Sequence, residues 1–192
     1  MYRLGTPGDE DIWATTEHIH ACVYEILNTD SSTPYLFAGM AASAPEVFVS
    51  LATCLTPPYF LLYILHTPRG EGAEGRYQSP ELSADALRLF VTDYAAFLTG
   101  DGRFDLWAYS PAEKATVVWD RHNYLFGYGP LERFADTLHE LGYVPGAVDR
   151  IASRPHSHHY REEFDDQALA VLDRFDWTYS PLHDADLQGE PA

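Results

Sequence analysis

The chain has 192 residues, of which 46% are hydrophobic and 14% aromatic, and this composition is sufficient for a folded domain with a core. Its 29 acidic residues outnumber 12 basic ones, which gives a formal net charge of −17. This charge argues against binding to nucleic acid or to an anionic membrane surface, because both ligands require a positive face. A basic protein is the partner that such a charge favours.

The chain is expected to form a single globular domain over residues 1–192, with a flexible acidic tail at 183–192. Its N-terminus lacks a basic segment followed by an apolar run, and no stretch approaches the roughly 18–20 apolar residues of a membrane span. We therefore expect a cytoplasmic protein. Lys114 is the only lysine beside eleven arginines, a bias that indicates GC-rich coding and a bacterial source.

Two helices are expected before residue 58. Apolar residues recur at spacings of three and four from Ile12 to Ile26, which predicts an amphipathic helix over about residues 9–28. The sequence SAPE places Ser43 as the N-cap of a second helix and Glu46 three positions later, a capping box. Pro57 and Pro58 end that helix.

Residues 59–66, YFLLYILH, form an apolar run without alternation, which predicts a central strand covered on both faces. After a loop at 68–81, Ser83 is expected to cap a helix that ends at Gly100. The segments 104–109, 115–120 and 124–129 are rich in strand-forming residues, and their short connections predict antiparallel hairpins.

The rest of the chain is expected to contain a helix that begins at Pro130 and ends at Gly142, a loop at 143–160, a helix over about 165–175 and a possible edge strand in WTYSPL. These elements predict an α+β fold. Its antiparallel sheet would be a meander of about three to five strands, with helices packed mainly on one face.

Chemistry-bearing residues concentrate in residues 154–166, RPHSHHYREEFDD. In an extended segment His156 and His158 project to one side while His159 turns away, and Asp120 or His122 could then complete a metal site. A metal-dependent hydrolase built on His156, His158 and His159 is therefore one hypothesis. A solvated loop or contact surface is the other interpretation of the same residues.

Other catalytic patterns are absent from the sequence. No G-x-S-x-G elbow or paired C-x-x-C occurs, and Glu71 and Glu74 interrupt the one glycine-rich stretch, where they would repel a phosphate. The leading interpretation is thus a non-enzymatic acidic binding protein without a cofactor. Its expected contact residues combine charge with aromatic anchors: Asp120, Arg121, His122, His156, His158, His159, Tyr160, Glu162, Glu163 and Asp165.

Three segments, PPYFLLYILHTPRG, LWAYSPAEKATVVWDRHNYLFGYG and PHSHHYREEFDD, resemble in order and composition the small acidic immunity proteins of bacterial toxin–immunity systems. The resemblance covers about residues 57–178. It implies one cytosolic α+β domain that binds and blocks a basic toxin. Charge attraction would speed the association of such a pair.

Overall fold

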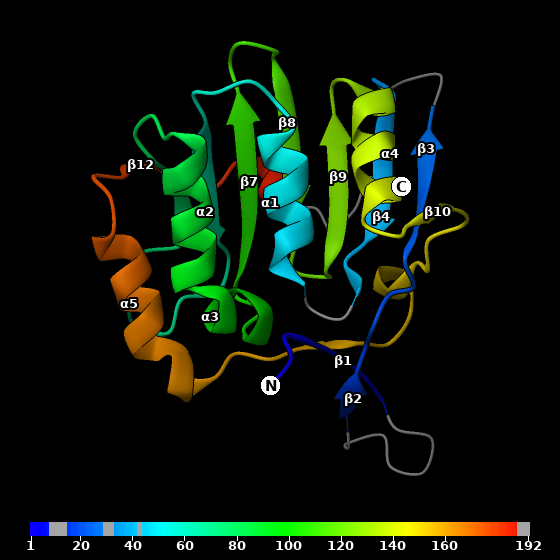
Figure 1. The fold of residues 1–192 in the computed structure, drawn as a ribbon. Helices are drawn as coiled ribbons and strands as arrows, with labels where there is room; N and C mark the ends of the chain where they lie inside the picture. The colour runs from blue at the N-terminus through cyan, green and yellow to red at the C-terminus, as the bar shows by residue number, and fades with distance from the viewer. Residues whose placement is uncertain (8–14, 29–32, 42–43, 188–192) are drawn as a thin grey trace.

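The computed structural model describes residues 1–7, 15–28, 33–41 and 44–187, which contain a nine-stranded sheet and a three-stranded sheet (Figure 1). From edge to edge, the large sheet consists of β10 (Val144–Pro145), β3 (Val23–Leu27), β4 (Tyr35–Gly39), β9 (Tyr124–Tyr128), β8 (Ala115–Trp119), β7 (Phe104–Ser110), β5 (Phe60–Leu65), β6 (Gly75–Gln78) and β12 (Thr178–Ser180). Neighbouring strands are antiparallel except β10 and β3, which are parallel.

The small sheet joins segments that are far apart in the sequence. It has the order β11 (Ser157–His158), β1 (Leu4–Pro7) and β2 (Thr15–Glu17), with both pairs antiparallel. The helices are α1 (Pro45–Thr53), α2 (Ala84–Asp93), α3 (Ala95–Gly100), α4 (Leu131–Glu140), α5 (Asp165–Asp173) and α6 (Asp184–Leu187), with 3-10 turns at Ile151–Ser153 and Glu162–Phe164.

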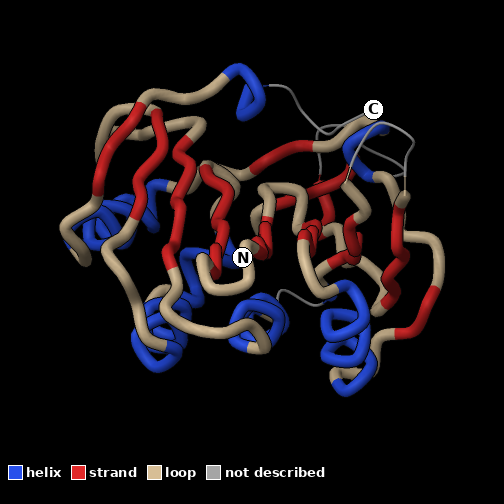
Figure 2. Tube along the Cα trace, turned by 90° about the horizontal axis from the view of Figure 1, so that it is seen from above, coloured by secondary structure: helices blue, strands red, loops and turns tan. Residues whose placement is uncertain are grey.

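The main core lies between the large sheet and a layer of helices. Figure 1 shows α1, α2 and α4 in front of the sheet, and Figure 2 shows most helices on one side of the strands. Phe48 of α1 and Phe134 of α4 are fully buried here, and the ring of Phe48 lies 5.9 Å from that of Trp119. Burial of such aromatic side chains is the principal source of stability in a layered fold.

A second apolar cluster covers the opposite face of β4, β8 and β9. Phe37, Tyr124 and Phe126 pack there with Ile151 from the connection after β10. The Tyr124 hydroxyl donates a hydrogen bond to the Asp149 carbonyl over 2.9 Å. These contacts hold the 148–153 segment, which leads into β11, against the sheet.

Several local expectations are confirmed. Ser83 caps α2, where its Oγ accepts the backbone N–H of Ala86 over 3.2 Å. The meander of β7, β8 and β9 is present, and β12 pairs with β6 at the sheet edge. The expected cap Ser43 lies outside the described residues.

The expected sheet of three to five strands is wrong, although the fold is α+β. The sheet is mixed, has nine strands, and is accompanied by a second sheet of three. The expected helix over 9–28 is one part of the error, because Thr15–Glu17 and Val23–Leu27 are strands and 8–14 lies outside the described residues. The others are strands in segments without an expected strand, β4, β6 and β10. Threonine, valine and isoleucine favour strands, and pairing with β4 and β10 satisfies the backbone of β3 in a way that local spacing did not indicate.

The run at 59–66 is also misplaced by the sequence reasoning. Its strand β5 is third from the β12 edge, while β8 occupies the middle of the sheet. Phe60 and Leu62 are only half-buried, so one face of β5 is partly open. An apolar run indicates that a strand is buried, but it does not indicate the position of that strand in the sheet.

The helices in the described ranges are short. The ten residues of α2 or of α4 extend about 15 Å, against a hydrocarbon layer about 30 Å thick. Within residues 1–187 as described, no helix combines the length and the apolar character needed to cross a membrane. A cytoplasmic location stays a prediction.

A buried ion-pair network connects the start of β7 to the segment that precedes α5. Arg103 is fully buried, and its Nε and NH2 groups donate to the two oxygens of Asp101 over 2.8 and 2.9 Å. It also donates to Glu71 and Asp165 over 3.0 Å each. Although burial lowers the pKa of Arg103, the hydrogen bonds to Asp101 and Glu71 outweigh it and raise that pKa. Arg103 therefore stays charged inside the protein.

We expect Arg103→Met to lower the free energy of unfolding by about 3–5 kcal/mol, because it leaves the buried carboxylates of Asp101 and Glu71 without their counter-ion. Urea unfolding followed by circular dichroism measures this change. The matched control is Arg88→Met, which removes an exposed pair with Asp85 and is expected to cost less than about 1 kcal/mol. Equal losses in the two variants would contradict a structural role for the network.

Candidate functional site

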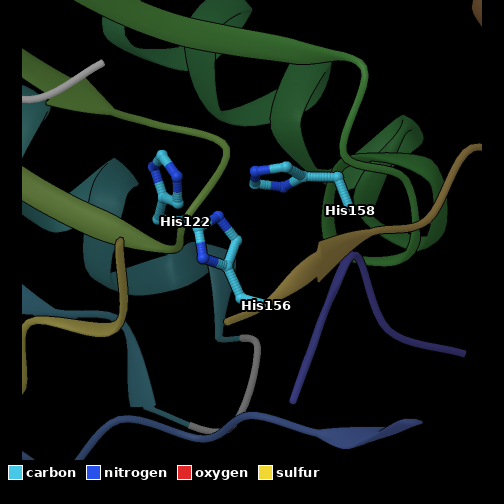
Figure 3. Close-up of side chains that lie close together, drawn as sticks. All are labelled: His122, His156 and His158. Atoms are coloured by element: carbon cyan, nitrogen blue, oxygen red, sulfur yellow. The ribbon is translucent and has the colours of Figure 1, made fainter. Parts of the chain in front are cut away.

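Three histidines from two distant segments converge at the end of the β8–β9 hairpin (Figure 3). His122 lies in the turn between β8 and β9, while His156 and His158 lie before and within β11. One ring nitrogen from each of the three lies within 4.8 Å of the others. The ring centroid of His122 is 5.1 Å from that of His156 and 4.8 Å from that of His158, with the rings edge to face.

Asp120 holds His122 in place. Its Oδ1 accepts the backbone N–H groups of His122 and Tyr124 over 3.0 and 2.8 Å, which closes the turn. Its Oδ2 lies 2.8 Å from Nδ1 of His122, and since a carboxylate can only accept, Nδ1 carries the proton. The lone pair of Nε2 is thereby left free, which is the carboxylate–histidine arrangement found at protein metal sites.

His156 is oriented in the same way by a backbone carbonyl. Its Nδ1 lies 2.7 Å from the carbonyl oxygen of Arg154, so Nδ1–H donates and Nε2 keeps its lone pair. Two of the three histidines therefore have a partner that fixes the ring and the tautomer. Such outer hydrogen bonds both orient a ligand and increase its basicity.

His158 is positioned by strand pairing. β11 pairs with β1 so that His158 lies opposite Leu4. Alternation along the strand puts His156 and His158 on one side and His159 on the other. Gly102 lies behind His158, where an added Cβ would be 2.9 Å from the Arg3 carbonyl oxygen and 3.2 Å from Cβ of His158. Glycine at this position gives His158 the space it occupies.

The environment keeps His158 neutral. Burial, and then the nearby His122 and the charges of Arg121 and Arg3, lower the pKa of His158 to about 2. Its Nδ1 is buried and has no hydrogen-bond partner in the part of the chain that the structure describes. Buried polar atoms are normally paired, so an unpaired imidazole nitrogen at a histidine cluster calls for an explanation. This nitrogen lies beside Gly102, 3.4 Å from where an added Cβ would stand.

The three imidazoles match the ligand set of a catalytic zinc site, in which three protein ligands leave a fourth position open. Zn–N bonds of about 2.0–2.1 Å in a tetrahedron place the nitrogens about 3.4 Å apart. The spacing here is at most 4.8 Å, so side-chain rotation of roughly 1.4 Å or less brings them into range. The three nitrogens therefore lie within about 1.4 Å of the spacing that zinc ligands have.

His159 is not part of the cluster. Its Nε2 lies 3.2 Å from Oγ1 of Thr15, and its ring packs edge to face on Tyr2 at 4.9 Å. The structure thus brings His156 and His158 together with His122 rather than with His159. Asp120, the other expected contributor, contacts His122 from outside the cluster.

Two further histidines at this site were missed by the sequence reasoning. His20 is buried, and its Nε2–H donates to the His122 carbonyl over 2.9 Å. The ring of His18 lies 4.6 Å from that of His20. Both had been placed in a helix, although the H-x-H spacing at 18–20 repeats that at 156–158 and could have indicated a strand-like pair.

The residues expected to contact a basic partner have unequal exposure. Glu162 and Glu163 are exposed, and Arg121 and Tyr160 are half-buried. Asp165 accepts hydrogen bonds from Arg69 and Arg103, which lower its pKa despite the opposing effect of desolvation. Asp120 accepts hydrogen bonds within the β8–β9 hairpin, and Asp165 accepts them from Arg69 and Arg103. Both carboxylates are therefore engaged in internal hydrogen bonds.

Replacement of His122, His156 or His158 by alanine is expected to weaken Zn²⁺ binding by more than the roughly 10–100-fold that loss of an outer hydrogen bond costs. His159→Ala is the matched control and should bind Zn²⁺ as the unmodified protein does. Competition with a chromophoric chelator on tag-free protein measures these affinities. Zinc affinity that is unchanged in all four variants would rule out this site.

Asp120→Asn tests the outer shell of the same site. We expect zinc affinity to fall about 10–100-fold, because the amide oxygen stays on the backbone N–H groups of the turn and the amide NH2, which cannot accept, then faces Nδ1–H of His122. The backbone hydrogen bonds of the turn can persist, since the amide oxygen still accepts. Circular dichroism and thermal unfolding of this variant verify the fold, and a folded variant with undiminished affinity would show that Asp120 does not support the ligand.

No family model, curated protein sequence or solved structure matches this chain. The resemblance to immunity proteins gains no support from these comparisons, and a bacterial toxin as partner stays a prediction. The chemistry of the chain therefore has to be argued from its own geometry.

Proposed function

We propose that the protein is a Zn²⁺-dependent hydrolase whose metal is held by His122, His156 and His158. The observation that carries this proposal is the convergence of three imidazoles, two with the tautomer that frees Nε2 for coordination. A solvated loop gives no reason for a hairpin histidine and two strand histidines to gather with their rings 4.8 to 5.2 Å apart. Nor does it explain the bond between Asp120 and His122.

Zinc at an open three-ligand site lowers the pKa of its bound water to about 7, which supplies a nucleophile at neutral pH. The protein contributes the geometry. Asp120 and the Arg154 carbonyl keep two rings in one orientation, and the pairing of β11 with β1 sets the third. Because these groups are held before substrate arrives, they need not reorganise during the reaction.

An acidic protein that neutralises a basic partner remains a prediction from the net charge and the resemblance. Two of its expected contacts, Asp120 and Asp165, are engaged in internal hydrogen bonds. Glu162 and Glu163 are exposed, but two exposed acids are common on any acidic protein. In that function the three histidines would be contact residues, but contact does not require their convergence or the hydrogen bond between Asp120 and His122, and this is why we propose the hydrolase in its place.

The test uses 4-nitrophenyl acetate as a general probe of a metal-activated water. The zinc-loaded protein is expected to hydrolyse it faster than metal-free protein or the His122→Ala variant. The rate should rise with pH through about 7, since hydroxide and not water is the nucleophile.

Removal of zinc with a chelator should abolish the activity, and re-addition should restore it. His159→Ala serves as the control with an intact cluster and should retain the full rate. Protein that binds one zinc ion but hydrolyses neither 4-nitrophenyl acetate nor 4-nitrophenyl phosphate faster than the His122→Ala variant would contradict the proposed function and leave a non-catalytic metal site.

A further inference from the structure

Two arginines lie near the histidine cluster of this negatively charged protein. The chain carries a formal charge of −17, yet two arginines are near His158: Arg121 in the hairpin turn and Arg3 just before β1, the strand that pairs with β11. Both are close enough for their charges to act on the His158 imidazole. The carboxylates of Asp105, Asp120 and Asp101 also act on the buried Arg3, so Arg121 is the one of the two that is placed to attract an anion.

These two arginines are not neutralised by direct ion pairs within the described residues. Arg3 is fully buried and donates to the carbonyls of Leu98 and Phe104 over 3.1 and 2.6 Å. The guanidinium of Arg121 has no hydrogen bond or salt bridge in the described ranges, and only its backbone N–H donates, to Asp105 over 2.8 Å. Arg121 is half-buried, so its guanidinium, whose charge also acts on Asp105, is partly accessible to a ligand.

The ligand set adds to this positive character. Three neutral imidazoles leave the full double charge on a bound Zn²⁺, whereas a carboxylate ligand would reduce it. The carboxylate nearest to the ligands, Asp120, is outside the ligand set and holds His122. The open metal position and Arg121 thus present two positive groups to an incoming molecule.

We propose that the site takes phosphate esters, with one non-bridging oxygen on the metal and another on the Arg121 guanidinium. This inference rests on the proposed function, whose substrate class it names. A phosphoryl group carries its charge on the reacting centre and offers two oxygens for two cations, while a carboxylic ester or amide offers one uncharged oxygen. Hydrolysis then forms a bond from water oxygen to phosphorus and breaks the ester P–O bond, and the departing alkoxide takes up a proton.

The experiment replaces Zn²⁺ by Co²⁺, whose visible absorption reports the coordination of the ion. Inorganic phosphate is titrated into the Co²⁺-loaded protein, and the absorption change gives its dissociation constant. We expect phosphate to shift the spectrum and Arg121→Gln to weaken phosphate binding about 10–100-fold, the loss of a hydrogen bond to a charged group. The affinity for Co²⁺ itself should not fall in this variant, because Arg121 is not a ligand and its positive charge repels the ion.

Arg88→Gln is the matched control, because Arg88 is on α2 in the helix layer and donates to Thr53. It should bind phosphate as the unmodified protein does. Acetate is titrated in parallel, and binding of acetate as tight as that of phosphate would overturn the phosphoryl class.

The experiment distinguishes failure of the phosphate-ester substrate class from failure of the proposed hydrolase function. Protein that binds Co²⁺ but shows no spectral change with phosphate overturns the substrate class and leaves the metal hydrolase standing. Phosphate binding that is equal in Arg121→Gln and in the control overturns the role of Arg121. Protein that binds no Co²⁺ at all overturns both, and this is read from the metal affinity before phosphate is added.

Discussion

The buried segment Asp101–Arg103 fastens the C-terminal third of the chain to the sheet. Arg103 binds Asp101, Glu71 and Asp165, and Asp101 also accepts the backbone N–H of Arg161 over 2.9 Å. Between them, the N–H of Gly102 donates to the His159 carbonyl over 2.9 Å. Residues 159–165 are thereby held at both ends, and β11 just before them has a defined place beside β1. The position of His158 depends on this attachment.

The candidate site combines one histidine on a hairpin of the large sheet with two histidines on or beside a short strand of the small sheet. His122 belongs to a hairpin in the middle of a nine-stranded sheet, where Asp120, His20 and Tyr124 restrain it. His156 and His158 arrive on a short strand of the small sheet, which contributes few hydrogen bonds of its own. A two-residue strand is not stable by itself. The buried ion pairs of Arg103 stabilise its position by holding the residues that follow it. The geometry that could bind a metal is thus a property of the junction between the two sheets.

Local signals were sufficient for part of the fold and part of the site. Ser83 before an amphipathic run indicated the start of α2, and the short connections around β8 indicated the meander. The H-x-H-H pattern at 156–159 indicated that alternate histidines share a side. The prediction for the first 40 residues was wrong, because the spacing of their isoleucine and valine residues also fits a helix. They form strands because they pair with β4, β10 and β11, which the local sequence does not reveal. His20 was lost with that segment.

The amino-acid sequence by itself determined the acidic character, the α+β class, the start of α2, the hairpins of β7, β8 and β9, and the side shared by His156 and His158. Each of these depends on residues within a few positions of one another, where dihedral preferences and side-chain alternation act directly. The tertiary structure alone decided which histidine joins them and which strands neighbour each other. His122 and His158 are brought together by pairing of β11 with β1 and by the contacts at residues 101–103, and such long-range hydrogen bonds leave no periodic trace in the sequence.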